Sequence, residues 1–166
     1  MKRTTPAEEV RLLQEITRII GSMADFKEML HEIIALVSRL TRADACFMYV
    51  HDPARKELVL SSSKTPHPNI MGKIRLKLGE GIAGLAAKEN TTLIIHGQNV
   101  TGIVKDTNRI KSLLKRPNIK NSFIMPLLVK DKVFGVLNLH TKKNESKIDD
   151  NLDNLQYLSK LLSSAF

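Results

Sequence analysis

Residues 73–84, which read KIRLKLGEGIAG, decide the fold of this chain. In residues 73–78, basic and apolar side chains alternate strictly, which predicts a β-strand with one face in water and the other buried. Gly79 and Gly81 can adopt the positive φ of a sharp turn, so we expect a short helix to follow over residues 82–88. A strand with one wet face is typical of an antiparallel sheet, because parallel sheets are covered on both faces.

Short strands are expected on both sides of this stretch. Residues 45–50 are a continuous apolar run that is too short for a helix. Residues 57–61 follow after the turn at Asp52-Pro53, so the two runs predict a hairpin. Two further apolar runs near the C-terminus are joined by a tight turn at residues 130–132. Six strands are expected in all, over residues 45–50, 57–61, 73–78, 92–95, 122–129 and 133–140.

Both ends of the chain are expected to be helical. Thr5 and Glu8 have the spacing of a capping box at the start of a first helix, and Asp25 and Glu28 repeat that spacing before a second. Apolar residues recur three and four apart along both helices and along a C-terminal one. This order of elements predicts an α+β fold with an antiparallel sheet. We expect a single domain over residues 1–166, with N-terminal helices at 1–41, a sheet with inserted helices at 43–142 and a C-terminal helix at 149–165.

The composition narrows the class of protein. The chain has 166 residues, of which 42% are hydrophobic and 26% charged, as in an ordinary soluble domain. It shows neither an apolar signal core nor the roughly 20 apolar residues needed to cross a bilayer, so a cytoplasmic protein without a membrane partner is expected. The net charge of +9 is partly concentrated in residues 101–120, which predicts either a solvated basic face or a surface for an acidic protein partner. Nucleic acid is disfavoured, because only 4% of residues are aromatic and a single-strand platform needs exposed aromatic rings.

Five blocks of sequence, in order, resemble the GAF domain family, and the similarity covers roughly residues 10–164. The blocks are residues 41–45 (TRADA), Asp52-Pro53 with Glu57-Leu58, residues 73–84, residues 126–129 (PLLV) and residues 135–140 (GVLNLH). The resemblance is to bacterial signalling members, such as those preceding phosphotransferase or histidine-kinase modules. It implies a six-stranded antiparallel sheet with the terminal helices on one face. A roof of loops and short helices on the other face would enclose a ligand pocket.

The resemblance also implies a regulatory role, with a small molecule bound between the sheet and the segment at residues 97–120. The alternative is a scaffold or dimerisation module whose pocket is filled by packed side chains, because nearly all candidate lining residues are apolar. By analogy with the fold, the candidate lining residues are Phe47, Tyr49, Leu76, Leu78, Ile82, Leu85, Val104, Ile110, Phe123 and Met125.

Dimerisation through the terminal helices is a further expectation. Val10, Leu13 and Ile20 form a second apolar edge on the first helix, and Leu161 and Phe166 do so on the last. An apolar arc wider than one contact suggests a second copy of the chain, in a parallel helical bundle. The ordinary explanation of a single stripe is contact with the sheet. The candidate interface residues are Leu12, Ile16, Ile19, Leu158 and Leu162.

The glycines of residues 79–84 match the pattern G-x-G-x-x-G, but the surroundings disfavour a dinucleotide site. Such a site needs a buried parallel strand before it and an acidic residue at the end of the next strand. Here the preceding strand has a wet, basic face, and the next one ends in residues 95–98 (IHGQ), without a carboxylate. The glycines are better interpreted as permitting a tight turn and close packing of the short helix.

No catalytic or metal-binding constellation is evident, so an enzyme is not expected. Cys46 is the single cysteine and lies in an apolar run, where a buried thiol is inert. GAF-fold methionine-sulfoxide reductases need several cysteines, and bilin-binding members use a cysteine in another element. The five histidines are scattered, without the spacing of metal ligands. The Asn-Lys-x-Phe-x-Asp-Glu motif of cyclic-nucleotide-binding members is absent. A ligand or cofactor, if one binds, is therefore left unidentified by the residues.

Overall fold

The computed structural model describes residues 5–22, 25–65, 69–97, 99–102, 121–142 and 149–165. The helices in these residues are α1 Pro6–Ser22, α2 Phe26–Thr41, α3 Gly81–Glu89 and α5 Leu152–Ala165, with a 3₁₀ turn, η1, at Asp149–Asn151. The strands are β1 Ala45–Asp52, β2 Glu57–Ser63, β3 Arg75–Lys77, β4 Leu93–His96, β5 Asn99–Thr101, β6 Asn121–Val129 and β7 Lys132–Thr141.

The strands form one antiparallel sheet in the order β3-β2-β1-β7-β6-β4-β5. The predicted α+β class is therefore confirmed. The described sheet has seven strands where six were expected, because Asn99–Thr101 pairs with β4 as a short edge strand. With one apolar residue between two polar ones, this segment carries too little periodicity to predict a strand.

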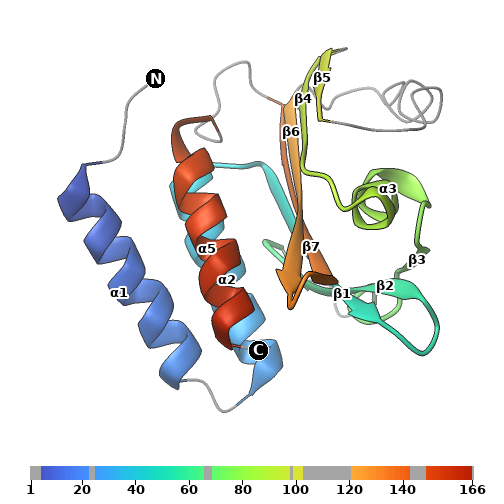
Figure 1. The fold of residues 1–166 in the computed structure, drawn as a ribbon, viewed down its shortest axis with the longest axis horizontal. Coiled ribbons are helices and arrows are strands. Elements are labelled where there is room, and N and C mark those ends of the chain that lie inside the picture. Colours follow the sequence, from blue (N-terminus) through green and yellow to red (C-terminus); the bar gives the residue numbers. More distant parts are fainter. Residues whose placement is uncertain are drawn as a thin grey trace.

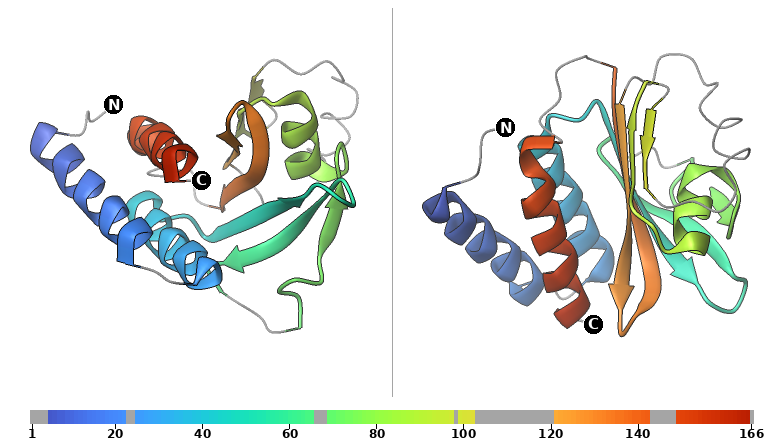
Figure 2. Two further views of the ribbon diagram at one scale, coloured as in Figure 1. Left: turned by 60° about the horizontal axis from the view of Figure 1, so that its bottom comes forward. Right: turned by 45° about the horizontal axis from the view of Figure 1, so that its top comes forward.

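The helices divide between the two faces of the sheet. In Figure 1, α2 and α5, which overlap in this view, lie on one side of the sheet, and α3 lies on the opposite side. Helix α2 packs on β1 and β2, α5 packs on β6, and α1 packs on α2 and α5. Both views of Figure 2 place α1 on the outside of this helical layer, away from the sheet. The molecule thus has a three-helix layer, the sheet, and the thinner cover that includes α3.

Alternation along the strands divides the apolar residues between two cores. On β1, Cys46 and Met48 are buried with the terminal helices, as are Leu137 and Leu139 on β7. The intervening residues face the α3 side, where a smaller core includes Val136. The side chains at alternate positions of these central strands therefore either join the helical core or line the space below α3.

The stripe residues assigned to a dimer interface are instead buried inside the chain. Because α1 packs chiefly on α2 and α5, its stripe and that of α5 are used to hold the helical layer together. Of the predicted second apolar edge, Val10 is 51% exposed, whereas Ile20 and Leu161 are partly buried and pack against the core. Tyr157 on α5, which was not part of that edge, is 47% exposed. The buried stripe residues are Leu12, Ile16, Ile19, Leu158 and Leu162.

Capping fixes the starts of both N-terminal helices, by the expected capping box at Thr5 and by a single side-chain cap, without Glu28, at Asp25. The Thr5 backbone N–H donates to Glu8 Oε2 at 2.8 Å, and the Glu8 N–H donates to Thr5 Oγ1 at 3.3 Å, which is a complete capping box. At α2, Asp25 Oδ1 accepts from the Lys27 N–H at 3.0 Å. Phe26, the first residue of α2, is 40% exposed.

The glycine-rich turn of residues 79–84 joins an edge strand to α3. Gly79 and Gly81 have φ of +90° and +65°, a region that L side chains rarely adopt. A Cβ at Gly84 would lie 2.6 Å from the carbonyl oxygen of Lys77, so α3 can approach β3 this closely only with glycine there. The turn and close packing expected of these glycines are both present, and β3 pairs antiparallel with β2.

Candidate functional site

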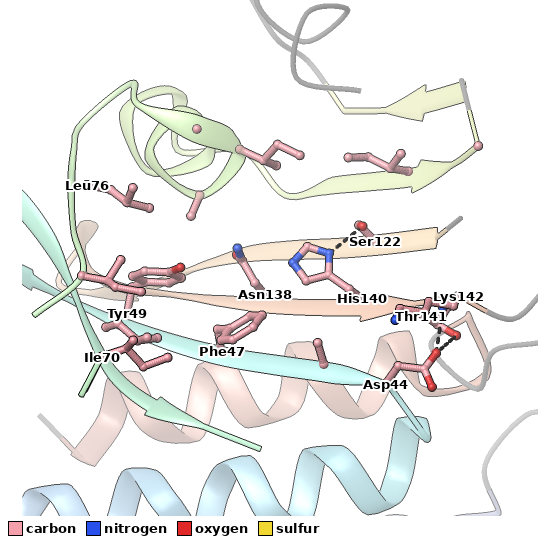
Figure 3. A pocket seen from close by; sticks show the side chains of 18 residues that line it. Asp44, Phe47, Tyr49, Ile70, Leu76, Ser122, Asn138, His140, Thr141 and Lys142 are labelled. Carbon is pink, nitrogen blue, oxygen red and sulfur yellow. Dashed lines mark hydrogen bonds between the residues drawn. The ribbon is translucent and has the colours of Figure 1, made fainter. Parts of the chain in front are cut away.

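A cavity of about 600 Å³ lies between the sheet and the cover that includes α3. Figure 3 shows its floor, formed by side chains of β1, β6 and β7, and α3 above it. Residues from the segment before β3, from β2 and from the end of β4 complete the wall. The lining residues are Asp44, Ala45, Phe47, Tyr49, Leu60, Ile70, Ile74, Leu76, Gly81, Ile82, Ala83, Ile95, Gly97, Ser122, Asn138, His140, Thr141 and Lys142.

The position of the cavity follows from strand alternation and from small side chains. Because residues 45, 47 and 49 of β1 point away from the helical core, Phe47 and Tyr49 form an aromatic part of the floor. Small residues stand at several wall positions, including Ala45, Gly81 and Ala83. Their short side chains leave the space that larger residues would fill.

Apolar and polar side chains gather at different ends of the cavity. Figure 3 places Tyr49, Ile70 and Leu76 together at one end, and Ser122 and Thr141 toward the other. The site is therefore amphipathic, with an apolar end and a hydrogen-bonding end.

Hydrogen bonds hold the polar end in place. Ser122 Oγ and His140 Nδ1 lie 2.7 Å apart across the β6–β7 pair. Asp44 Oδ2 accepts from Thr141 Oγ1 at 3.0 Å and from the Lys142 backbone N–H at 2.7 Å. These last two bonds tie the start of β1 to the end of β7, so this part of the wall is fixed by the chain itself.

Asn138 lies between the two ends and differs from its polar neighbours. Its side chain rises from the middle of β7, and its amide nitrogen points into the cavity (Figure 3). The residue is only 6% exposed. Its Oδ1 is buried and accepts no hydrogen bond from the described residues. Buried polar groups are nearly always paired, so this amide requires an explanation.

Four of the candidate lining residues border the cavity, namely Phe47, Tyr49, Leu76 and Ile82. Leu85 is buried in the small core between α3 and the sheet, and Leu78 is 36% exposed at the surface; neither lines the cavity. Two further candidates, Val104 and Ile110, lie outside the described residues, as do positions 103–120 of the predicted basic partner surface.

Phe123 and Met125 lie on the opposite face of the sheet from the cavity. Both belong to the helical core, while their neighbour Ser122 lines the cavity. Strand β6 is apolar on both faces, so its sequence has no alternation from which to assign a face. Asn138 and His140 line the cavity but were not among the predicted lining residues. The sequence does carry a signal for them, because they are polar residues two apart in an apolar strand and so share one face of the sheet.

The single cysteine is on the helical side of the sheet and not at the cavity. Cys46 is fully buried, and burial raises the pKa of its thiol to about 12, against smaller opposing effects of Ser38 and Lys64. The thiol is therefore protonated at neutral pH and a poor nucleophile. In the part of the chain that the structure describes, no three His, Cys, Asp or Glu side chains are grouped so as to hold a metal ion.

Comparison with known proteins assigns the family. A model of the GAF domain matches residues 25–166, which include the sheet, α2, α3 and α5. The chain belongs to the GAF domain family. Helix α1 precedes the matched part of this GAF domain. No curated protein matches this chain significantly. Among the described residues, no helix is both long and apolar enough to cross a membrane.

Solved structures share the fold of this GAF domain over nearly its whole length. The GAF domain of an Acinetobacter phosphoenolpyruvate-protein phosphotransferase has a TM-score of 0.75 at 22% identity, covering 98% of this chain and 94% of that one. The free methionine-R-sulfoxide reductase of Neisseria meningitidis, in complex with its substrate, has a TM-score of 0.68 at 16% identity, covering 100% and 94%. A phycoerythrobilin-bound GAF domain from a cyanobacterial phytochrome has a TM-score of 0.69 at 18% identity, covering 97% and 95%.

Proposed function

We propose that this GAF domain is a regulatory module that binds a small molecule in the cavity below α3. The observation that carries the proposal is the cavity itself, which has about 600 Å³ of space and an apolar and a polar end. Sites for small molecules typically measure roughly 300–1,000 Å³ and combine apolar walls with a few polar groups. The substrate-bound and bilin-bound structures of the same fold add support, since those proteins hold small molecules.

The cavity favours this proposal over a scaffold module with a filled pocket. Protein interiors are packed to the density of organic crystals, with few voids larger than a water molecule. A core that served packing alone would bring larger side chains to positions such as Ala45 and Ala83, and it would not leave a buried amide such as Asn138 unpaired.

A role without catalysis fits the chemistry at the cavity better than an enzymatic one. Cys46, the only cysteine, faces the opposite side of the sheet, so the cavity has no thiol. The close pair of Ser122 and His140 could suggest a hydrolytic nucleophile and base. However, Ser122 lies inside a strand paired on both sides, with Ile95 on β4 and with His140 on β7, so its surrounding backbone serves the sheet and not an oxyanion hole.

The polar end of the cavity adjoins the helices that would carry a signal outward. Asp44 lies three residues after the end of α2 and holds Thr141 at the end of β7. Asn151, in the turn before α5, donates from Nδ2 to the Leu40 carbonyl in the last turn of α2 at 2.9 Å. We infer that a ligand at the polar end biases the positions of α2 and α5, because a ligand shifts a conformational equilibrium through contacts that differ between its states.

Dimerisation through the terminal helices remains part of the proposal, with a different surface from the buried stripe. Val10 and Tyr157 are the large exposed hydrophobic residues of α1 and α5. They give a second copy of the chain an apolar contact, which supports an interface on the outer surface of the two helices.

A substitution that fills the cavity tests the binding proposal. Ile82 lines the cavity from the first turn of α3, so Ile82→Trp should occupy part of its volume. Lys88→Trp adds the same side chain at an exposed position of the same helix and serves as the matched control. Both variants and the wild type are incubated with a cell extract of small molecules and examined by native mass spectrometry.

We expect one or more bound masses with the wild type and with Lys88→Trp, and none with Ile82→Trp. Equal occupancy of Ile82→Trp, with its fold intact by circular dichroism, would place binding elsewhere and refute the proposal. A bare protein mass in all three samples would favour the scaffold alternative.

A further inference from the structure

The side-chain amide of Asn138 is a hydrogen-bonding group that the protein leaves unused at the centre of its cavity. No described residue forms a hydrogen bond with it, and Oδ1 is buried. The residue is 94% buried on a central strand, and its backbone is held by pairing with β1 on one side and with β6 on the other. An asparagine amide offers both donors and an acceptor, and its nitrogen points into the cavity (Figure 3).

The surroundings of Asn138 are aromatic and aliphatic. Phe47 is its register partner on β1, and Tyr49 follows on the same face of that strand. Leu60, Ile74 and Leu76 extend the apolar wall beyond them. A molecule that reaches the amide must therefore place the rest of its body against apolar side chains, which favours an apolar or aromatic body.

The charges of the described lining residues cancel. With histidine counted as neutral, only Asp44 and Lys142 carry a formal charge, and they have opposite signs. The Asp44 carboxylate already accepts hydrogen bonds from Thr141 and from the Lys142 backbone. An anionic ligand would lose its hydration without gaining an excess of positive charge, although the whole chain carries a net charge of +9. The cavity is thus suited to an uncharged molecule.

We propose that the cavity selects an uncharged ligand with an apolar body and an amide-like polar end, and that Asn138 is the residue that recognises this end. The ligand carbonyl would accept from Asn138 Nδ2, and a ligand N–H could donate to Oδ1 once the side-chain amide turns toward it. This inference rests on the proposed binding function and adds the chemical class of ligand to it.

Two matched probes test this selectivity. Biphenyl-4-carboxamide is uncharged and carries an amide on an aromatic body, and biphenyl-4-carboxylate has the same body and an anionic end. Each is titrated by isothermal titration calorimetry into the wild type, Asn138→Leu and Ser62→Ala. Asn138→Leu keeps the size of the side chain and removes the amide. Ser62→Ala is the matched control, because Ser62 Oγ is also buried and unpaired but does not line the cavity.

We expect the wild type and Ser62→Ala to bind the carboxamide at least about tenfold more tightly than the carboxylate, and Asn138→Leu to lose about tenfold in carboxamide affinity, the scale of one lost hydrogen bond in a desolvated site. The Tm of Asn138→Leu should not fall, because an unpaired buried amide is replaced by an apolar group. Should Asn138→Leu fail to fold, Asn138→Ala replaces it, since it only enlarges an existing cavity.

Three results would overturn the inference: tighter binding of the carboxylate, carboxamide affinity unchanged by both Asn138 variants, or no carboxamide binding. None of them decides the proposed function, which depends on whether Ile82→Trp excludes molecules that the wild type binds. If extract molecules bind the wild type but not Ile82→Trp, and the carboxamide preference is missing, the site is real and the assigned ligand class is wrong.

Discussion

Single residues set the distance between α3 and the sheet, and hence the height of the cavity. Gly84 is buried in α3, and its missing Cβ allows the backbone of Lys77 to approach the helix. Gly79 and Gly81 turn the chain so that α3 begins directly after β3. The G-x-G-x-x-G pattern therefore serves packing, and it does so at the wall of the candidate site, since Gly81 itself lines the cavity.

Adding one methyl group at Gly84 should destabilise the protein. In Gly84→Ala the new Cβ would lie 2.6 Å from the Lys77 carbonyl oxygen, so helix or strand must shift. We expect the free energy of unfolding to fall by about 1–3 kcal/mol. Gly21→Ala is the matched control: nothing lies within 4 Å of its Cβ position, and it should stabilise α1 by about 0.4–1 kcal/mol. Urea denaturation measures both, and equal effects at the two sites would contradict the role given to Gly84.

At the scale of secondary structure, the sequence allowed most helices and strands to be predicted. It did not always predict to which face of the sheet the side chains of a strand point. The capping box at Thr5 and the alternation around β3 predicted element type and position, because local hydrogen bonding and periodicity are written in neighbouring residues. The faces of β6 were not predictable, since Phe123 and Met125 are embedded in a strand that is apolar on both sides. Strand β5 is too short to show a period.

The candidate site was predictable only in part, for a related reason. Phe47 and Ile82 could be placed at the cavity from the fold implied by the family resemblance. The unpaired state of Asn138 depends on which side chains surround it in three dimensions, and no local pattern encodes that. The burial of Ile16 and Leu158 was likewise unpredictable, because a single amphipathic stripe is compatible with either an internal or an intermolecular partner.

Helix α1 provides a prediction that separates these two kinds of contact. Ile16→Ala removes a side chain that is 1% exposed in the helical core, so the free energy of unfolding should fall by about 2–5 kcal/mol. The double variant Val10→Glu with Tyr157→Glu changes exposed residues only. Each of its two substitutions should change the free energy of unfolding by at most about 0.5 kcal/mol.

The double glutamate variant also tests the outer surface of the helices as an interface. Analytical ultracentrifugation should show a dimer for the wild type and a monomer for the double glutamate variant. A double variant that sediments as the wild type does would exclude this surface from dimerisation. A wild type that is monomeric at high concentration would remove dimerisation from the proposal altogether.

At the scale of the whole molecule, the sheet separates a packed side from an open side. The terminal helices fill one face with the larger core, and the opposite face keeps a cavity with an unpaired amide on its floor. Asp44, just after α2, is bonded to Thr141 at the polar end of that cavity, and Asn151 bonds the turn before α5 to the end of α2. This arrangement places a candidate receptor site and a candidate output surface on opposite sides of one sheet.

Nuclear magnetic resonance of the ¹⁵N-labelled protein tests this account most directly. During titration with biphenyl-4-carboxamide, the largest chemical-shift changes should fall on the side-chain amide of Asn138 and on the backbone amides of Phe47, Ile82 and His140, with smaller changes reaching Asp44. Changes confined to α1 and α5 around Val10 and Tyr157 would contradict a ligand site on the α3 face of the sheet, and unchanged spectra would contradict the ligand class assigned to that site.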